Sequence, residues 1–553
     1  MRTRRWMGWL VAIGMAGTAS AETLYNGITL PVEWPPRLAD FPENPITPPY
    51  LASPPAVIPI DVGRQLFVDD FLVENTTLKR TFHAPEYHSA SPILKPDQPW
   101  ESAGRGPAVM PFSDGVWFDA KDKLFKMWYY AGHGGGQTCC ATSKDGIRWE
   151  KPKLDVVPDT NIVLKGGRDS NTVWLDHNAT DPQQRFKMAV YAGGGMLSLF
   201  RSADGIHWTK AGDGSKTGDR SSFFYNPFRE RWVFSIRSGS KRGRSRHYWE
   251  TTDFFNFTPQ VSEKKEPVVW VASDNADWKR DDLLTQPQLY NLDCAAYESV
   301  LVGLFSVWRG DYRGAKQTSK AIELNQLGRP KQNSICVGFS RDGFHWNRPD
   351  RRPFCPVSEK MGDWNWGNVQ SVGGCCLVVG EKLYFYVSGR AGKGFPGCNF
   401  HDAGASTGLA ILRRDGFASM DAGDAGATLT TRRVRFSGNR LFVNLAAPKG
   451  ELRVEAIDER GEPIAPFTRA NCEPIHGDKT LLPVSWRGGR DLSKLAGRPV
   501  RFRFHLKNGS LYSFWVSPDA GGASHGYVAA GGPGFTGPTD TAGIAAYRIE
   551  ETK

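Results

Sequence analysis

The chain has 553 residues, a formal net charge of +11, and 23% charged residues. This length exceeds one ordinary hydrophobic core, so we expect two or three structural units rather than a single domain. The 60 Gly, 37 Pro and 19 Trp residues indicate many turns and many aromatic side chains that are buried or face a ligand.

Residues 1–21 have the pattern of an export signal. Arg2, Arg4 and Arg5 form a basic start, residues 6–16 are apolar, and residues 19–21 are the small residues that signal peptidase accepts. The apolar run is shorter than the roughly 20 residues of a spanning helix, and no later segment is apolar enough to span. We therefore expect a secreted or periplasmic protein with no membrane span.

Positive charge is concentrated in residues 241–246, which read Lys-Arg-Gly-Arg-Ser-Arg. Such a cluster attracts anionic partners, and outside the cell this favours an acidic or sulfated glycan over nucleic acid. The alternative is a solvated surface loop.

The nine cysteines show no metal-binding spacing and no CxxC pair. Their odd number leaves at least one thiol unpaired within the chain, although export permits disulfides. We predict no metal site and no catalytic cysteine, and both buried thiols and separate bridges remain open.

The segment 22–59 is rich in proline, with ten prolines between residues 31 and 59. Proline at this density disfavours helix and interior strand, so we expect an extended surface segment, with the folded body beginning near Ile60.

A short pattern then recurs along the chain. It reads Ser-x-Asp-Gly-x-x-Trp at residues 143–149, 202–208 and 340–346, with weaker copies at 252–257 and 414–417. Asp-Gly between apolar strands predicts a hairpin, because glycine readily adopts the positive φ of a tight turn. The serine can hydrogen-bond across the turn, and the tryptophan can pack beneath it.

Aromatic strands precede these hairpins, and together they describe a four-stranded blade. Five copies predict a five-bladed β-propeller over residues 60–421. The Ala- and Gly-rich residues 418–427 then suggest a linker, and alternating apolar and polar residues over 428–551 predict a β-sandwich. The expected fold class is therefore all-β, a propeller followed by a C-terminal sandwich.

With these features the chain resembles the five-bladed propeller glycosidases of glycoside hydrolase families 32 and 43, and family 32-like secreted bacterial proteins in particular. The likeness covers nearly all of the mature chain and rests on residues 66–74, 92–96, 100–101, 126–129, 288–291, 297–298 and 511–514. It implies a glycoside hydrolase acting on a poly- or oligosaccharide, exo-acting because a funnel closes around a chain end. It implies no cofactor and allows a structural calcium ion.

The chain departs from family 32 at two motifs. It has neither the Trp-Met-Asn-Asp-Pro-like nucleophile motif in the first blade nor the Arg-Asp-Pro motif further on. Neither fructan specificity nor a retaining mechanism is therefore implied.

Glycoside hydrolysis usually needs two carboxyl groups, one protonated and one ionised. In a propeller such groups can converge from the inner strands of different blades. The catalytic candidates are Asp69 or its neighbour Asp70, Asp176 after a second-blade strand, and Glu298 within an apolar strand that would raise its pKa. The alternatives are turn caps for the aspartates and structural ion pairing for Glu298.

Candidate substrate contacts are stacking aromatics and fork-shaped donors. Trp364 and Trp366 lie in a polar stretch before a strand, and Arg105, Arg220 and Arg246 can bind hydroxyl, carboxylate or sulfate groups. The alternative for each arginine is a surface or structural role. The hairpin aspartates at 145, 204 and 342 recur once per blade, which identifies them as turn formers.

Two other functions remain open. The propeller can be a carbohydrate-binding module without catalysis, its carboxylates being structural. The repeats also resemble the Asp-box of sialidases, but those enzymes usually have six blades and require three arginines with a Tyr–Glu pair.

Overall fold

The computed structural model describes residues 21–134, 136–256, 266–283, 285–310, 318–398 and 404–548. The expected export signal lies outside these ranges except for its last residue, so it remains a prediction. Within them the chain is almost entirely β, with short α-helices α1 (Pro49–Ala52) and α2 (Ser319–Gln326). No helix in the described part is long and apolar enough to cross a membrane.

The first three blades are separate antiparallel sheets, each following the chain order. Blade one comprises β7 (Val116–Asp119), β8 (Leu124–Ala131), β9 (Gln137–Ser143) and β10 (Ile162–Leu164), with β6 (Val109–Met110) also pairing with β8. Blade two comprises β11 (Ser170–Leu175), β12 (Phe186–Tyr191), β13 (Met196–Ser202) and β14 (Thr209–Lys216). Blade three comprises β15 (Ser222–Asn226), β16 (Arg231–Ser240), β17 (Gly243–Thr251) and β18 (Val268–Ala272).

The last two blades share one nine-stranded sheet. Blade four comprises β19 (Gln288–Glu298), β20 (Val300–Gly310) and β21 (Gln332–Ser340). Blade five comprises β22 (Asn368–Gln370), β23 (Leu377–Val379), β24 (Lys382–Arg390), β25 (Ala405–Arg413) and β5 (Glu86–Tyr87). A single parallel pairing, Asn333 with Asn368, joins the two blades.

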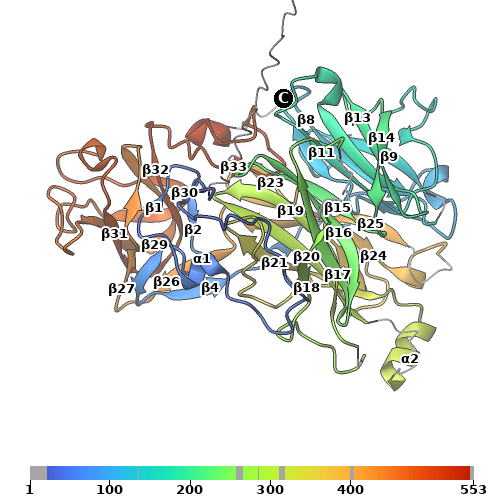
Figure 1. Ribbon diagram of the computed structural model, residues 1–553, viewed down its shortest axis with the longest axis horizontal. Helices are drawn as coiled ribbons and strands as arrows, with labels where there is room; N and C mark the ends of the chain where they lie inside the picture. Colours follow the sequence, from blue (N-terminus) through green and yellow to red (C-terminus); the bar gives the residue numbers. More distant parts are fainter. Residues whose placement is uncertain are drawn as a thin grey trace, which may run out of the picture.

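Contacts between neighbouring blades close the ring. The inner strands β7, β11, β15 and β19 touch in succession, β21 meets β22, and β24 and β25 meet β6 of blade one. Strand β5 precedes blade one in the chain but pairs with β25 of blade five. The all-β, five-bladed propeller is confirmed, and Figure 1 shows it to the right of the sandwich.

The repeated hairpins have the predicted internal contacts. Ser143 Oγ accepts a hydrogen bond from the backbone N–H of Gly146 (2.9 Å), and the Trp149 indole donates to the carbonyl of Gly146 (3.2 Å). Asp145 Oδ1 accepts from two backbone N–H groups after the turn. The copy at residues 202–208 repeats these bonds. The hairpin aspartates are therefore turn formers, as predicted.

The C-terminal sandwich is built around one long bent strand. Strand β29 (Arg440–Ile457) pairs through its first half with β32 (Gly509–Ser517) and through its second half with β31 (Arg501–Lys507). The remaining strands are β2 (Gln65–Leu66), β3 (Val73–Thr76), β4 (Lys79–Phe82), β26 (Ala418–Ala422), β27 (Ala427–Thr431) and β30 (Ile475–Pro483). Bending one strand lets it serve two layers that enclose an apolar core.

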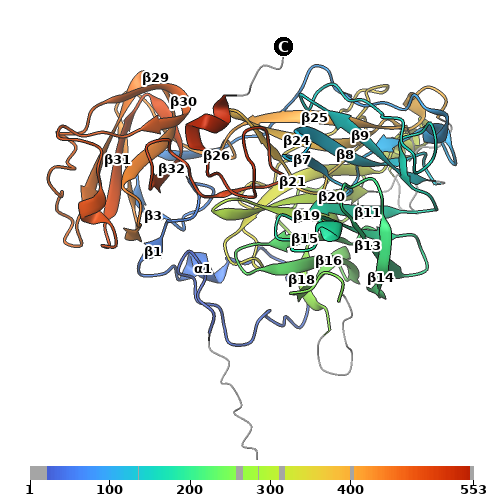
Figure 2. The same cartoon turned by 90° about the horizontal axis from the view of Figure 1, so that it is seen from above.

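Three boundaries differ from those predicted. Residues 65–82 pair with sandwich strands rather than with the propeller, and the expected linker forms β26 and the start of β27. Leu24, Ile28 and Leu30 are buried in the sandwich core, so the folded body begins before Ile60. Burial of these apolar side chains outweighs the tendency of the proline-rich segment to stay free. Figure 2 shows this segment running along both domains.

Candidate active site

Two of the four predicted catalytic carboxylates lie where the N-terminal strands meet the sandwich. Asp69 is buried and accepts two hydrogen bonds of 2.8 Å from the guanidinium of Arg341. Its neighbour Asp70 is exposed and pairs with Arg80. Asp69 therefore has the contacts of a structural ion pair, and Asp70 those of a surface residue.

The other two also have structural partners. Asp176 follows β11 and forms a buried ion pair with Lys187 of the adjacent β12. Glu298 ends β19, is 0% exposed, and accepts hydrogen bonds from Arg414 Nη2 (3.1 Å) and Ser524 Oγ (2.7 Å). Burial raises its pKa, as expected from its sequence, while two arginines oppose that shift. The four residues thus occupy three separate environments.

The propeller funnel contains a different set of charged residues. The first of them lie where the inner strand of blade one is interrupted. Strands β6 and β7 both pair with β8, and residues 111–115 bulge between them. Phe112 has φ +46° there, which is costly for a bulky residue, and its N–H donates to Ser388 Oγ of blade five (2.8 Å). The bulge places Ser113 and Asp114 among the inner strands.

Three aspartates precede the inner strands of three consecutive blades: Asp114 before β7, Asp169 before β11 and Asp219 before β15. Arg168 Nη2 donates to Asp114 Oδ2 (2.9 Å), which links the first two positions. The backbone N–H of Arg220 donates to Ser170 Oγ (2.9 Å), which links the second and third. We call Asp114, Asp169, Asp219, Arg168 and Arg220 the funnel cluster.

The environment favours the protonated form of two of these carboxyls. Asp114 is 0% exposed, and burial raises its pKa to about 6 against the opposing charge of Arg168. Burial and the nearby Asp219 raise the pKa of Asp169, which is half-buried. Asp219 is held instead by two cations, with 3.0 Å to Arg237 Nη1 and 3.3 Å to Arg244 Nη1.

Blade four contributes polar groups to the same region. Asp293 accepts hydrogen bonds from Asn291 Nδ2 (2.8 Å) and Ser371 Oγ (2.6 Å). Asn291 Nδ2 also donates to Ser113 Oγ (2.8 Å), next to Asp114. The charge of Asp293 contributes to the raised pKa of Asp114.

Arg220 is the least satisfied charged side chain of the funnel cluster. It is 1% exposed, yet none of its three guanidinium nitrogens has a hydrogen-bond partner in the described part of the chain. It lies 3.5 Å from the ring centroid of Phe112, and both residues have positive φ. Burial lowers the pKa of Arg220. A buried charge without hydrogen bonds is costly and suggests a site kept for function.

The predicted substrate-binding residues separate into two groups. Arg246 donates to the backbone carbonyl of Arg220 (2.7 Å), and burial lowers its pKa to about 9, so both arginines belong to the funnel. Trp366 is 1% exposed in the interior, Trp364 packs against Gly389 and Gly408 of blade five, and Arg105 is exposed in the loop before β6.

Sequence reasoning missed the aspartates of the funnel cluster. One signal was present, because Arg168-Asp169-Ser170 retains the first two residues of the Arg-Asp-Pro motif. Asp114-Gly115 and Asp219-Arg220 stand in polar segments that are hard to distinguish from ordinary loops before the strand pairing is known.

Two other predictions concern a bound metal ion and the state of the cysteines. Among the residues described, no group of three or more His, Cys, Asp or Glu side chains is arranged to hold a metal ion, so a structural calcium ion remains an expectation. All nine cysteines are buried free thiols.

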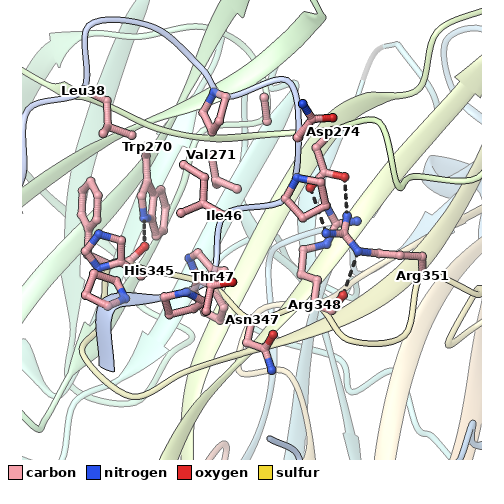
Figure 3. Close-up of a pocket in the computed structure, with 18 residues that line it drawn as sticks. Leu38, Ile46, Thr47, Trp270, Val271, Asp274, His345, Asn347, Arg348 and Arg351 are labelled. Carbon is pink, nitrogen blue, oxygen red and sulfur yellow. Dashed lines mark hydrogen bonds and ion pairs between the residues drawn. The ribbon is translucent and has the colours of Figure 1, made fainter. Parts of the chain in front are cut away.

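A cavity of about 280 Å³ lies between the proline-rich segment and blades three and four. Figure 3 shows Leu38 and Ile46 from that segment facing Trp270, with Arg351 bound to Asp274 at one side (2.9 Å). Arg348 is likewise paired with Asp277. Because these charges are paired with each other, the cavity lacks the acid–base arrangement of the funnel.

No protein-family model and no curated protein sequence matches the chain. Solved structures that match include a glycosyl hydrolase from Bacteroides ovatus (13% identity, 60% of this chain and 94% of that chain, TM-score 0.37). Others are a fructofuranosidase from Schwanniomyces occidentalis (11%, 78% and 98%, 0.36) and an α-L-arabinofuranosidase from Podospora anserina (11%, 60% and 98%, 0.35). These similarities are too low to transfer a substrate or a residue role.

Proposed function

We propose that the protein is a glycosidase-like, carbohydrate-active enzyme whose reaction takes place at the funnel cluster. The observation that carries this proposal is the convergence of Asp114, Asp169 and Asp219 from three consecutive blades, where burial and Asp219 raise the pKa of Asp169. Cleavage of a glycosidic bond needs one carboxyl to donate a proton and a second to attack or to activate water.

We assign proton donation to Asp169. It is half-buried, and burial together with the charge of Asp219 raises its pKa, so it holds a proton to higher pH than an ordinary aspartate. Asp219 is the favoured second carboxylate because it forms ion pairs with Arg237 and Arg244 beside Asp169. Asp114 is fully buried against Arg168 and acts as a positioning residue for that arginine.

The charge of the funnel favours an acidic glycan. Six arginines accompany four aspartates there: Arg168, Arg220, Arg237, Arg244, Arg246 and Arg390 with Asp114, Asp169, Asp219 and Asp293. A carboxylate or sulfate on the sugar would bring acceptors to such guanidinium groups. We also propose that the enzyme acts at the end of the glycan chain, because the inner strands of the propeller converge on a single funnel.

The test is turnover of a panel of neutral, uronate-containing and sulfated oligosaccharides, with products separated by chromatography. Parallel assays with and without inorganic phosphate distinguish hydrolysis from phosphorolysis. We expect turnover of an acidic member and a loss of about 10²-fold or more in Asp169→Asn, the usual contribution of general acid catalysis.

The matched control is Asp213→Asn, which changes an exposed aspartate in the outer hairpin of blade two. This variant should retain the activity of the unaltered protein. Equal turnover by Asp169→Asn and by the control would contradict the assignment of the acid.

A carbohydrate-binding propeller without catalysis is the second candidate. It is favoured by the ion pairs that engage Asp219 with Arg237 and Arg244, because a carboxylate so engaged is less available for chemistry. Saturable binding of an acidic glycan without any turnover would support this function. The five-bladed ring does not favour the sialidase-type alternative, which usually has six blades.

A further inference from the structure

A second cavity, of about 390 Å³, opens at the opposite ends of the inner strands. We call it the aromatic cavity because four of the residues that line it are aromatic: Trp117, Trp174, Tyr225 and Tyr527. The first three come from blades one to three, and Tyr527 comes from β33 (Tyr527–Val528), which pairs with β19. The cavity therefore exists only where the C-terminal segment docks on the propeller.

The aromatic cavity is separate from the funnel cluster. Strand β11 begins at Ser170, which bonds Arg220, and it ends at Leu175, which lines the cavity. A six-residue strand spans roughly 20 Å. None of the three funnel aspartates lines the cavity.

The charge of the aromatic cavity is opposite to that of the funnel. Among the described residues, its lining includes two carboxylates, Asp176 and Glu230, and no lysine or arginine. Lys187 neutralises Asp176 from β12, which leaves the exposed Glu230 as the principal charge. Burial lowers the pKa of His177, which keeps this lining residue neutral near pH 7.

Glu230 lines the aromatic cavity from an ordered turn. It lies in the turn between β15 and β16, where Asn226 accepts hydrogen bonds from the N–H groups of Phe228 (3.1 Å) and Arg229 (3.4 Å). Glu230 lines the cavity together with Tyr225 and Tyr527, and its charge adds to the burial that raises the pKa of both phenols.

We propose that the aromatic cavity binds an organic ammonium group. Aromatic rings attract a cation through their π-faces, and an adjacent carboxylate supplies the counter-charge without a competing lysine or arginine in the lining. The volume suits a small ligand or one terminal group of a larger molecule. This site is independent of the proposed chemistry in the funnel.

The test uses choline as the probe and 3,3-dimethylbutan-1-ol as its neutral isostere. Both are titrated into the full-length protein by calorimetry, with tryptophan fluorescence as a second readout. We expect saturable 1:1 binding of choline and binding at least about 10-fold weaker for the alcohol, as a desolvated cation–π contact provides. Equal binding of the two compounds, or no choline binding at millimolar concentrations, would overturn the proposal.

Variants assign the binding to this cavity. Glu230→Gln should weaken choline binding about 10-fold, whereas Glu459→Gln, which alters an exposed turn of the sandwich, should leave it unchanged. Tyr527→Leu should also weaken binding while the thermal melting curve stays intact. Unchanged affinity in both Glu230→Gln and Tyr527→Leu would overturn the proposal, whatever the glycan assays show for the funnel.

Discussion

The protein contains two buried clusters of arginines and carboxylates that differ in how completely their charges are paired. Between the domains, Arg64 donates to Asp415 (3.1 Å) and Arg414 donates to both Glu298 (3.1 Å) and Asp540 (2.7 Å). We call these five residues the interdomain cluster. In the funnel, by contrast, the guanidinium of Arg220 has no hydrogen bond to any described residue.

This difference distinguishes a structural cluster from a candidate site. In the interdomain cluster, partners from the propeller, the sandwich and the C-terminal segment satisfy most of the buried donors and acceptors, so the charges hold the domains together. In the funnel, the guanidinium nitrogens of Arg220 have no described hydrogen-bond partner, and burial raises the pKa of Asp114. Both features lower the stability of the folded protein, and a bound ligand can offset that cost.

The largest expected effect comes from removing a partner in the interdomain cluster. Arg414→Met leaves Asp540 buried without its cation and leaves Glu298 with Arg64 alone, so we expect the free energy of unfolding to fall by about 3–5 kcal/mol. Urea denaturation monitored by tryptophan fluorescence measures this. A loss below 1 kcal/mol would show that the cluster does not join the domains.

The next effect concerns pH and the funnel. The pKa of Asp114 is about 6 in the folded protein and near 3.8 in an ordinary aspartate, so the folded state binds the proton more tightly. Stability should therefore fall as pH rises from about 4 to 6, by on the order of 2–3 kcal/mol for this residue.

Asp114→Asn should flatten that fall in stability, which denaturation at a series of pH values detects. Asp169 contributes in the same direction and remains in the variant, so part of the slope should persist. An unchanged slope in Asp114→Asn would mean that Asp114 is ionised throughout this range.

The same substitution as at Arg414 has the opposite consequence in the funnel. Arg220→Met removes a buried charge that lacks hydrogen bonds, so stability should stay level or rise by about 1–2 kcal/mol. Binding or turnover of an acidic glycan should be lost at the same time. If Arg220→Met destabilised the protein as much as Arg414→Met, Arg220 would be a structural residue like Arg414, contrary to our interpretation of the funnel.

The smallest effect is expected at Asp70, a candidate from the sequence. It is exposed and paired with Arg80 at the surface, so Asp70→Asn should change stability by less than about 1 kcal/mol and leave glycan turnover unaltered. A large loss of turnover would restore Asp70 as a catalytic residue and weaken the assignment to the funnel cluster.

The blades could be predicted from the sequence because each hairpin is stabilised by contacts among its own residues. Ser143, Asp145 and Gly146 form their turn through bonds within a few residues, so the repeat is readable without the rest of the fold. Arg220 and Arg246, two of the arginines that the sequence suggested as substrate contacts, lie together in the funnel, and their contact with a ligand stays a prediction.

The carboxylates proposed for catalysis could not be chosen in the same way. Glu298 lies in an apolar strand, as expected for a buried general acid. The sequence does not show that it forms ion pairs with Arg64 and Arg414, because both are distant in the chain. Asp114, Asp169 and Asp219 become a set only when three inner strands are brought side by side. The domain boundaries failed for the same reason, because β2, β3 and β4 pair with strands near the other end of the chain.

The pairing of β5 with β25 has a consequence for the order of assembly. Glu86 is synthesised long before its partner Ile411. Strand β5 therefore has no β-strand partner until blade five has been synthesised. Unpaired edges of this kind are prone to associate with other chains, and contacts so distant in sequence slow folding. The ring is thus completed late, and we expect its yield to depend on how well the first ninety residues are protected until the last blade emerges.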